Sequence, residues 1–198
     1  MSYQSLEDLL GLEKKLPVTE NWSAAADFLQ LISEYCLLNK PRVIVECSSG
    51  TSSLVLAQCC HVNRLGHVYS LENGDEFLEQ TSRQLEAFLL TDYCDVIHAP
   101  LRDVPLGDKA FQWYDAGGLP DEKIDMLVID GPPGFIQKHS RYPALPLLGD
   151  KLAEHCIIFL DDAAREDELE LVELWQKQHP EFSYEYVDNE RGCSILKR

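Results

Sequence analysis

The sequence predicts an α/β fold, a mostly parallel sheet of seven strands with helices on both faces and an antiparallel hairpin at its C-terminal end. Two observations lead to this prediction. Apolar runs of strand length alternate with segments of helical period, which is typical of parallel strands joined by helices. The last two runs are joined only by NERG (189–192), which is too short for a crossover, so they predict a hairpin.

The expected strands are apolar runs of five to seven residues, and several are apolar almost throughout, as strands buried on both faces should be. In chain order they are RVIVEC (42–47), HVYSLE (67–72), DVIHA (95–99), IDMLVID (124–130), CIIFLDD (156–162), FSYEYVD (182–188) and CSILK (193–197).

The expected helices lie between these runs. The segment 52–62 continues directly from a turn of small residues. The segment 75–90 places five apolar residues on one face: Phe77, Leu78, Leu85, Phe88 and Leu89. Two more helices are expected in 141–155 and 165–179, the former confined by its prolines to its later turns. A helical N-terminal segment, 1–40, contains NWSAAADFLQLISEYCLL (21–38) and precedes a core of 41–198; we expect the 198 residues to form one domain.

Composition narrows the function. Seventeen Lys and Arg stand against 34 Asp and Glu, and a net charge of −17 repels phosphate backbones and anionic lipid surfaces, which argues against nucleic-acid and membrane partners. No apolar run is long enough to span a bilayer, and no signal peptide is apparent, so we expect a cytoplasmic protein. The cysteines are expected to be core thiols in a reducing compartment; they are residues 36, 47, 59, 60, 94, 156 and 193.

Acids and an imidazole stand at the carboxyl ends of the first five expected strands, where open α/β sheets bind their ligands. These residues are Glu46, Glu72, His98, Asp130 and the pair Asp161–Asp162. A surface this acidic would supply some of them by chance, but not obviously all of them on one edge.

The first strand end leads into Ser48, Ser49, Gly50, Thr51, Ser52 and Ser53. One interpretation is a turn followed by a helix N-cap. The other is a binding loop, because backbone N–H groups at a helix start can hold a carboxylate. No Lys follows the glycine, and the loop lacks a full GxGxxG pattern, so it is neither a P-loop nor a dinucleotide fingerprint. Together with Glu72, which can accept hydrogen bonds from a ribose diol, the loop indicates a nucleoside site.

These motifs carry a resemblance. VIVECSSGTSSLVLA (43–57) resembles motif I of the S-adenosylmethionine-dependent methyltransferases of the seven-strand Rossmann-like class, VYSLEN (68–73) their second motif and IDMLVIDGPPG (124–134) their fourth. From about residue 40 to 198 the chain is similar to the small-molecule O-methyltransferase branch related to catechol O-methyltransferase. Where that family reads E-x-G-x-G, Ser48 replaces the first glycine, and a serine can hold this turn if its φ stays negative.

The resemblance implies that S-adenosylmethionine lies across the edge of the sheet. Its methionine part would meet the loop 47–53, with Glu46 orienting the loop and the amino group. Its ribose would meet Glu72, and its adenine would lie near Asn73. The implied cofactor-binding residues are completed by Cys47, Ser48, Ser49, Gly50, Ser52, Ser53, His98, Ala99, Pro100, Leu101 and Asp130.

Methyl transfer is an in-line displacement that requires a positioned oxygen and help in losing its proton. Asp130, Asp161 and Asp162 offer oxygen ligands that suit Mg²⁺ or Ca²⁺, and they match the metal positions of the metal-dependent relatives. The alternative is that DGPPG (130–134) is a turn and that Asp161 or Asp162 is the N-cap of an ordinary helix. Lys138 and His139, on the loop after DGPPG, are the candidate proton acceptors, although those relatives carry a base much closer behind the first Asp.

We therefore predict that the protein is a methyltransferase that acts on a hydroxyl of a small-molecule acceptor. An NAD-dependent oxidoreductase is a less favoured alternative, because pyrophosphate binding needs more than one glycine, and a non-catalytic nucleoside-binding or interaction module is another. Arg141 and Arg165 either receive an anionic substrate or pair with acids, and Trp22, Trp113 and Tyr114 either stack on the acceptor or pack. The sequence leaves a homo-oligomer open.

Overall fold

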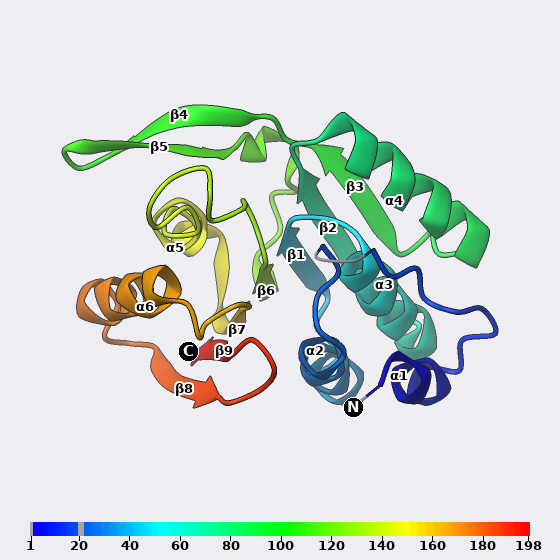
Figure 1. The fold of residues 1–198 in the computed structure, drawn as a ribbon. Helices are drawn as coiled ribbons and strands as arrows, with labels where there is room; N and C mark the ends of the chain where they lie inside the picture. Colours follow the sequence, from blue (N-terminus) through cyan, green and yellow to red (C-terminus); the bar gives the residue numbers. More distant parts are fainter. Residues whose placement is uncertain (1, 20–21) are drawn as a thin grey trace.

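A seven-stranded sheet forms the centre of the computed structural model, which describes residues 2–19 and 22–198 (Figure 1). Its strand order is β3-β2-β1-β6-β7-β9-β8. The strands are β1 (Val43–Cys47), β2 (His67–Glu72), β3 (Cys94–His98), β6 (Ile124–Ile129), β7 (Leu152–Leu160), β8 (Ser183–Val187) and β9 (Cys193–Lys197). All pairs are parallel except β7–β9 and β8–β9, so the predicted fold class and C-terminal hairpin are confirmed.

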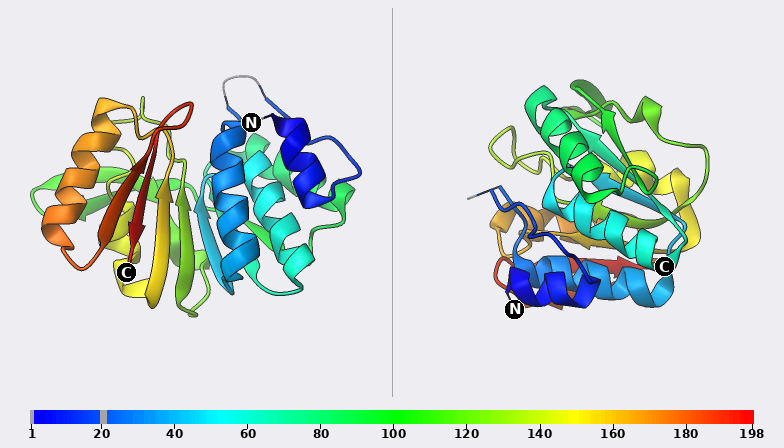
Figure 2. Two further views of the ribbon diagram at one scale, coloured as in Figure 1. Left: turned by 90° about the horizontal axis from the view of Figure 1, so that it is seen from below. Right: turned by 90° about the vertical axis from the view of Figure 1, so that its right-hand side faces the viewer.

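Helices cover both faces of the sheet (Figures 1 and 2). Successive residues of β1 separate the two layers: Ile44 packs into one apolar cluster and Val45 into the other, because side chains alternate along a strand. The Ile44 side holds α1 (Tyr3–Leu10), α2 (Ala26–Asn39), α3 (Thr51–Asn63) and α4 (Asp75–Phe88). The Val45 side holds α5 (Ala144–Leu148) and α6 (Glu166–Gln178). All seven cysteines are buried and free, as predicted.

The direction of chain progression changes between β1 and β6. From β1 the chain proceeds through β2 to β3 on one side, whereas β6 and β7 lie on the other side. Helices that leave neighbouring strands in opposite directions open a crevice at the carboxyl ends of those strands, where α/β sheets bind ligands. The carboxyl ends of β1 and β6 therefore mark the expected position of a site.

Two segments differ from the expectation. The helix predicted within 141–155 is reduced to α5 and a 3₁₀ turn, η2 (Gly149–Lys151), and residues 152–155 belong to β7 instead. A second, two-stranded antiparallel sheet of β4 (Leu101–Leu106) and β5 (Lys109–Tyr114) was not predicted. This hairpin extends over α5 in Figure 1 and precedes the short 3₁₀ helix η1 (Ala116–Gly118).

The N-terminal segment folds back over the start of α3. The predicted helix 21–38 corresponds to α2, which begins at Ala26, and its first residue, Asn21, lies outside the described residues. Thr51 Oγ1 donates to the carbonyl of Pro17 at 2.6 Å and lies 3.1 Å from Ser23 Oγ, so the segment before α2 is anchored beside the first strand end. Among the helices described, none combines the length and the apolar character that crossing a membrane requires.

Candidate functional site

A cavity of about 840 Å³ opens at the carboxyl ends of β1, β2 and β6, a volume within the usual range of small-molecule sites. Its walls come from the segment before α2, the loop after β1, the start of α4, the loop after β6 and the start of α6. Eight of the residues predicted to bind the cofactor or a metal line it: Ser48, Ser49, Gly50, Ser52, Glu72, Asn73, Asp130 and Asp162.

The loop after β1 and the end of β2 are joined by a hydrogen bond. Ser49 Oγ donates to Glu72 Oε2 at 2.7 Å, and the backbone N–H of Gly74 donates to Glu72 Oε1 at 2.8 Å. These bonds fix the orientation of a carboxylate that is only 6% exposed and still borders the cavity. Each carboxylate oxygen can accept more than one hydrogen bond, so Glu72 keeps acceptor capacity for a diol.

Ser48 holds the turn in a conformation that the sequence did not predict. Its φ is +113°, in the region that favours glycine, whereas a negative φ was the condition for a serine at this position. Its backbone N–H donates to the carbonyl of Leu71 at 3.0 Å, which ties the strained residue to β2. The turn therefore keeps the positive φ that the first glycine of the motif would adopt, although a serine occupies the position.

Replacing Ser48 by Gly is expected to stabilise the protein. Strain at a positive φ costs about 1–3 kcal/mol, and the greater backbone entropy of glycine in the unfolded chain offsets part of the gain. We expect a net stabilisation of about 1 kcal/mol and a rise in Tm of roughly 2–4 °C. Thermal unfolding of Ser48→Gly measures it, with Ser52→Gly in the first turn of α3 as the control that should lower Tm. A fall in Tm for Ser48→Gly would contradict the strain.

Glu46 lies beneath the loop rather than in the cavity. Its side chain is fully buried, and its Oε2 accepts hydrogen bonds from Ser53 Oγ at 2.5 Å and Ser70 Oγ at 2.7 Å. Burial raises the pKa of Glu46 to about 7, although bonds from the serines act in the opposite direction. The expectation that Glu46 orients the loop agrees with its bond to Ser53 in α3, while Cys47 is likewise buried behind the cavity wall.

The segment expected beside an adenine is placed differently. Asn73 borders the cavity, but His98, Ala99, Pro100 and Leu101 are not among its lining residues. His98 Nε2 lies 3.2 Å from Asp75 Oδ1, and Ala99 is buried with its backbone N–H donating to the carbonyl of Glu72. Adenine contacts with residues 98–101 stay a prediction.

The three acids predicted as metal ligands do come together. Oxygens of Asp130, Asp161 and Asp162 lie within 4.8 Å of one another at the ends of β6 and β7. The guanidinium of Arg141 already occupies this cluster: its Nη2 lies 3.2 Å from Asp130 Oδ1 and 2.8 Å from Asp162 Oδ2. Its Nη1 donates to the carbonyl of Asp161 at 2.8 Å. Arg165 Nη1 is a second cation, 2.8 Å from Asp162 Oδ2.

This arrangement does not fit a divalent ion held by the three acids. Two of the oxygens that would bind the ion face a guanidinium nitrogen, and a second cation there would be repelled at close range. Burial raises the pKa of Asp130 to about 6 and that of Asp161 well above its usual range, which opposes the ionised ligands that a metal needs. Metal binding by these acids thus remains an untested prediction with this geometry against it.

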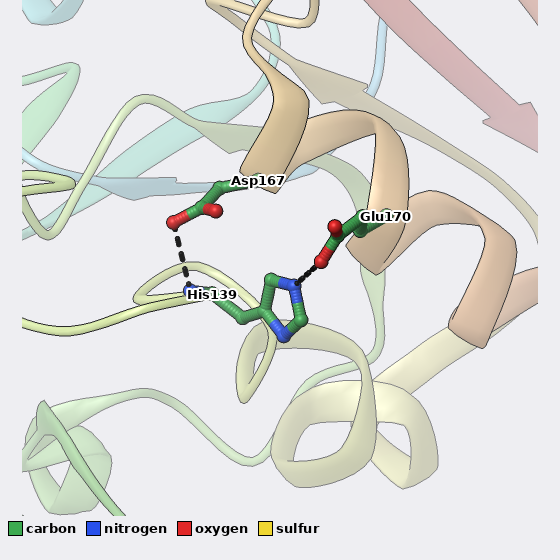
Figure 3. Close-up of side chains that lie close together, drawn as sticks. All are labelled: His139, Asp167 and Glu170. Carbon is green, nitrogen blue, oxygen red and sulfur yellow. Dashed lines mark hydrogen bonds and ion pairs between the residues drawn. The ribbon is translucent and has the colours of Figure 1, made fainter.

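The two predicted proton acceptors do not line the cavity. Lys138 Nζ and His139 Nε2 both lie 2.7 Å from Glu170 Oε2 on α6. The backbone N–H of His139 also donates to Asp167 Oδ2 at 3.3 Å, and Figure 3 shows both contacts of His139. Figure 3 shows the His139 ring directed at the helix. These contacts fasten the loop after β6 to α6, so the structure gives both residues a positioning role.

Several residues that line the cavity were not predicted from the sequence to do so. Thr81 Oγ1 lies 3.2 Å from Ser49 Oγ, and the ring of Phe77 lies 5.5 Å from that of Trp22 between centroids. The signal was a stripe on α4 at helical spacing, formed by Phe77, Gln80, Thr81 and Gln84. Of the aromatic residues considered for the acceptor, Trp22 and Tyr114 line the cavity, whereas Trp113 is buried in the core.

Several solved structures share this fold. A protein from Staphylococcus aureus described as a candidate caffeoyl-CoA O-methyltransferase is 15% identical, with a TM-score of 0.70 over 100% of this chain and 92% of its own. An O-methyltransferase from Bacillus cereus in complex with S-adenosylhomocysteine is 14% identical, with a TM-score of 0.68 over 99% and 90%. The S-adenosylhomocysteine-bound methyltransferase PaMTH1 of Podospora anserina is 13% identical, with a TM-score of 0.68 over 98% and 86%.

At these identities the solved structures establish a shared fold. The search of curated protein sequences produced no match. The sequence itself matches the family described as "Methyltransferase domain" over residues 45–163, which is more than half of the chain. The match contains the end of β1, all of β2 and β6, and the cavity loops that follow these strands. The chain therefore belongs to the methyltransferase-domain family.

Proposed function

We propose that the protein is an S-adenosylmethionine-dependent methyltransferase that methylates a hydroxyl oxygen of a small molecule. The observation that carries this proposal is the cavity wall made by Ser49, Gly50 and Glu72, in which a small-residue loop is bonded to a strand-end carboxylate. The family match supports methyl transfer, and the S-adenosylhomocysteine complexes of two similarly folded proteins support the choice of donor.

The residues present fit this donor. Glu72 can accept from ribose hydroxyls, and the first turn of α3 offers backbone N–H groups for a carboxylate. A Cβ built on Gly50 would meet no atom within 4 Å, so nothing crowds the loop on its open side. When bound, S-adenosylmethionine supplies a methyl group on a sulfonium centre.

The acceptor would enter between the loop after β6 and the segment before α2, which border the same cavity. Asp130 is the proposed proton acceptor, because it lines the cavity and burial raises its pKa to about 6, near a neutral working pH. Lys138 and His139, tied to Glu170, are not assigned this role. Trp22, Phe77 and Phe135 give the cavity aromatic surface that suits a hydrophobic or aromatic acceptor.

The proposed reaction uses no metal ion, because Arg141 already lies against the acids that would bind one. The proposed partner is the small-molecule acceptor alone. The net charge of −17 makes nucleic acid and anionic membranes poor partners.

Ligand-dependent thermal unfolding separates the candidate functions. S-adenosylhomocysteine at about 100 times its Kd should stabilise the protein by about 2.7 kcal/mol, which raises Tm by roughly 5–10 °C. NADH at the same concentration should not change Tm. A response to NADH alone would favour the oxidoreductase, and no response to either ligand would favour the non-catalytic module. A screen of hydroxyl compounds for release of S-adenosylhomocysteine then identifies the acceptor.

Glu72→Ala should weaken S-adenosylhomocysteine binding by about 10- to 100-fold, because hydrogen bonds to a charged group contribute roughly 1.5–3 kcal/mol. Isothermal titration calorimetry measures the change. Glu79→Ala, an exposed acid of α4 that pairs with Arg83, is the matched control and should bind as the wild type does. Glu72→Gln keeps the shape of the side chain and should fall between the two. Equal affinities in all four proteins would remove Glu72 from the site.

A further inference from the structure

We propose that Arg141 is the built-in cation of the strand-end cluster, so that the protein holds Asp130, Asp161 and Asp162 together without a divalent metal. In this view the resemblance to metal-dependent methyltransferases extends to the acids but not to the ion. The guanidinium is part of the chain, and its place is set by folding rather than by metal binding.

The contacts of Arg141 carry this inference. Its side chain is 3% exposed, and its Nη2 lies within 3.2 Å of three oxygens, the carbonyl of Asp130, Asp130 Oδ1 and Asp162 Oδ2. Nη1 donates to the carbonyl of Asp161 and lies 3.8 Å from Glu168 Oε1. One planar cation thus contacts groups that follow β6 and β7 and one group of α6, the kind of bonding for which the fork of guanidinium donors is suited.

The charges around Arg141 agree with its role. Burial disfavours its charged form, but attraction to Asp130, Asp162 and Glu168 more than offsets burial and raises its pKa. The guanidinium therefore stays charged at any working pH. Asp161 completes the cluster with Oδ1 accepting from the backbone N–H of Asp162, whereas its buried Oδ2 has no partner among the described residues. An arginine fits this set, because it neutralises charge and donates to carbonyls at once.

The loop between β6 and α5 is built to deliver this side chain. Ser140 Oγ lies 3.2 and 3.1 Å from the carbonyls of Pro132 and Pro133, which closes the loop on itself. His139 Nε2 and Lys138 Nζ each lie 2.7 Å from Glu170 Oε2, and Figure 3 shows the His139 contact. Arg141, two residues after His139, instead reaches the strand ends, where its Nη2 donates to Asp162 Oδ2. The residues first considered as proton acceptors thus position the loop that carries the cation.

Removing the guanidinium should expose a latent metal site. In Arg141→Ala the acids lose their buried counter-ion, while the half-exposed Arg165 stays beside Asp162. The cavity gains room, so Mg²⁺ or Ca²⁺ can take the place of the guanidinium among oxygens that suit both ions. Arg141→Lys keeps one positive charge and should stay indifferent to the ions. A consequence that rests on the proposed function is that methyl transfer by the wild type proceeds equally fast with a chelator.

The test is thermal unfolding of the full chain in MgCl₂ or CaCl₂ against KCl of equal ionic strength. The wild type and Arg141→Lys should show no saturable shift, whereas Arg141→Ala should lose roughly 10 °C and recover several degrees as either ion saturates. Adding Asp162→Asn to Arg141→Ala should abolish that recovery. A folded Arg141→Ala that ignores both ions would overturn the proposal.

The wild type provides an independent check if Arg141→Ala fails to fold. Calorimetric titration of wild-type protein with MgCl₂ or CaCl₂ should give no heat beyond dilution. One-to-one binding that Asp161→Ala removes would overturn the proposal without any variant at 141. These measurements need no methyl donor, so their outcome is separate from that of the S-adenosylhomocysteine experiments.

Discussion

Asp130→Asn is expected to lower kcat by about 100- to 10,000-fold with the acceptor found by screening, while S-adenosylhomocysteine binds with little change. General-base catalysis contributes an acceleration of that size, and asparagine cannot take a proton at neutral pH. Asparagine Oδ1 can still accept the bond from Arg141 that Asp130 Oδ1 accepts now, so the fold should persist. Steady-state kinetics and calorimetry of the same preparation separate the two effects.

The pH profile gives this prediction a second signature. Because burial raises the pKa of Asp130 to about 6, wild-type kcat/KM should rise with pH and reach half of its plateau near pH 6. Asp125→Asn is the control: Asp125 lies at the opposite end of β6, where its carboxylate accepts from the backbone N–H groups of Arg42 and Val43. If Asp125→Asn and Asp130→Asn retain the same kcat, Asp130 is not the base.

The fold was predictable because its strongest signals are local and agree with one another. Runs such as IDMLVID are apolar on both faces of a strand, and only a covered parallel sheet buries both faces. The short link 189–192 excludes a crossover, which predicted the terminal hairpin. Residues 152–155 were misassigned because Glu154 and His155, exposed at the start of β7, give that segment no strand alternation.

The hairpin β4–β5 was missed for a different reason. Pro105 argues against a strand, although it is tolerated in the two-stranded sheet, where it pairs with Ala110. Two signals were present in the sequence. Gly107 suits a two-residue turn, where its φ is +62°, and the polar Gln112 separates the apolar Phe111 and Trp113, both of which are buried. Both are weak beside the longer apolar runs.

The acids of the site were predictable, and their partners were not. Glu72 and Asp130 follow apolar strands, and parallel strands bring their carboxyl ends to one edge whatever the loops do. Arg141 reaches the acid cluster from the loop after β6, whereas Lys138 and His139 of the same loop contact Glu170 and do not line the cavity. Their directions depend on loop closure, through contacts such as Ser140 with Pro132, that no periodicity records. The positive φ of Ser48 is likewise imposed by its surroundings.

Glu46→Gln should remove a pH dependence of stability worth about 3 kcal/mol. Burial raises the pKa of Glu46 from 4.5 to about 7, so the folded protein binds this proton more tightly than the unfolded chain. The contribution of this proton to the free energy of unfolding is complete below about pH 4.5, declines as pH rises, and is lost above about pH 7. Its size follows from about 1.4 kcal/mol for each unit by which the pKa is raised. Glutamine Oε1 can accept from Ser53 and Ser70 as Glu46 Oε2 does, without ever ionising.

Urea unfolding of the wild type and Glu46→Gln between pH 5 and 8 measures this effect. Other acids with raised pKa, such as Asp130, are present in both proteins, so the difference between the two curves isolates Glu46. The variant should gain on the wild type as pH rises, and Glu79→Gln, an exposed acid, should run parallel to the wild type. Parallel curves for Glu46→Gln would mean that Glu46 titrates alike in the folded and unfolded chains. A gain in stability of Glu46→Gln over the wild type with rising pH would show that the ionised carboxylate of Glu46 destabilises the folded protein, because a buried charge is costly. The wild type nevertheless keeps this carboxylate under the loop, where it accepts a hydrogen bond from Ser53 in the first turn of α3.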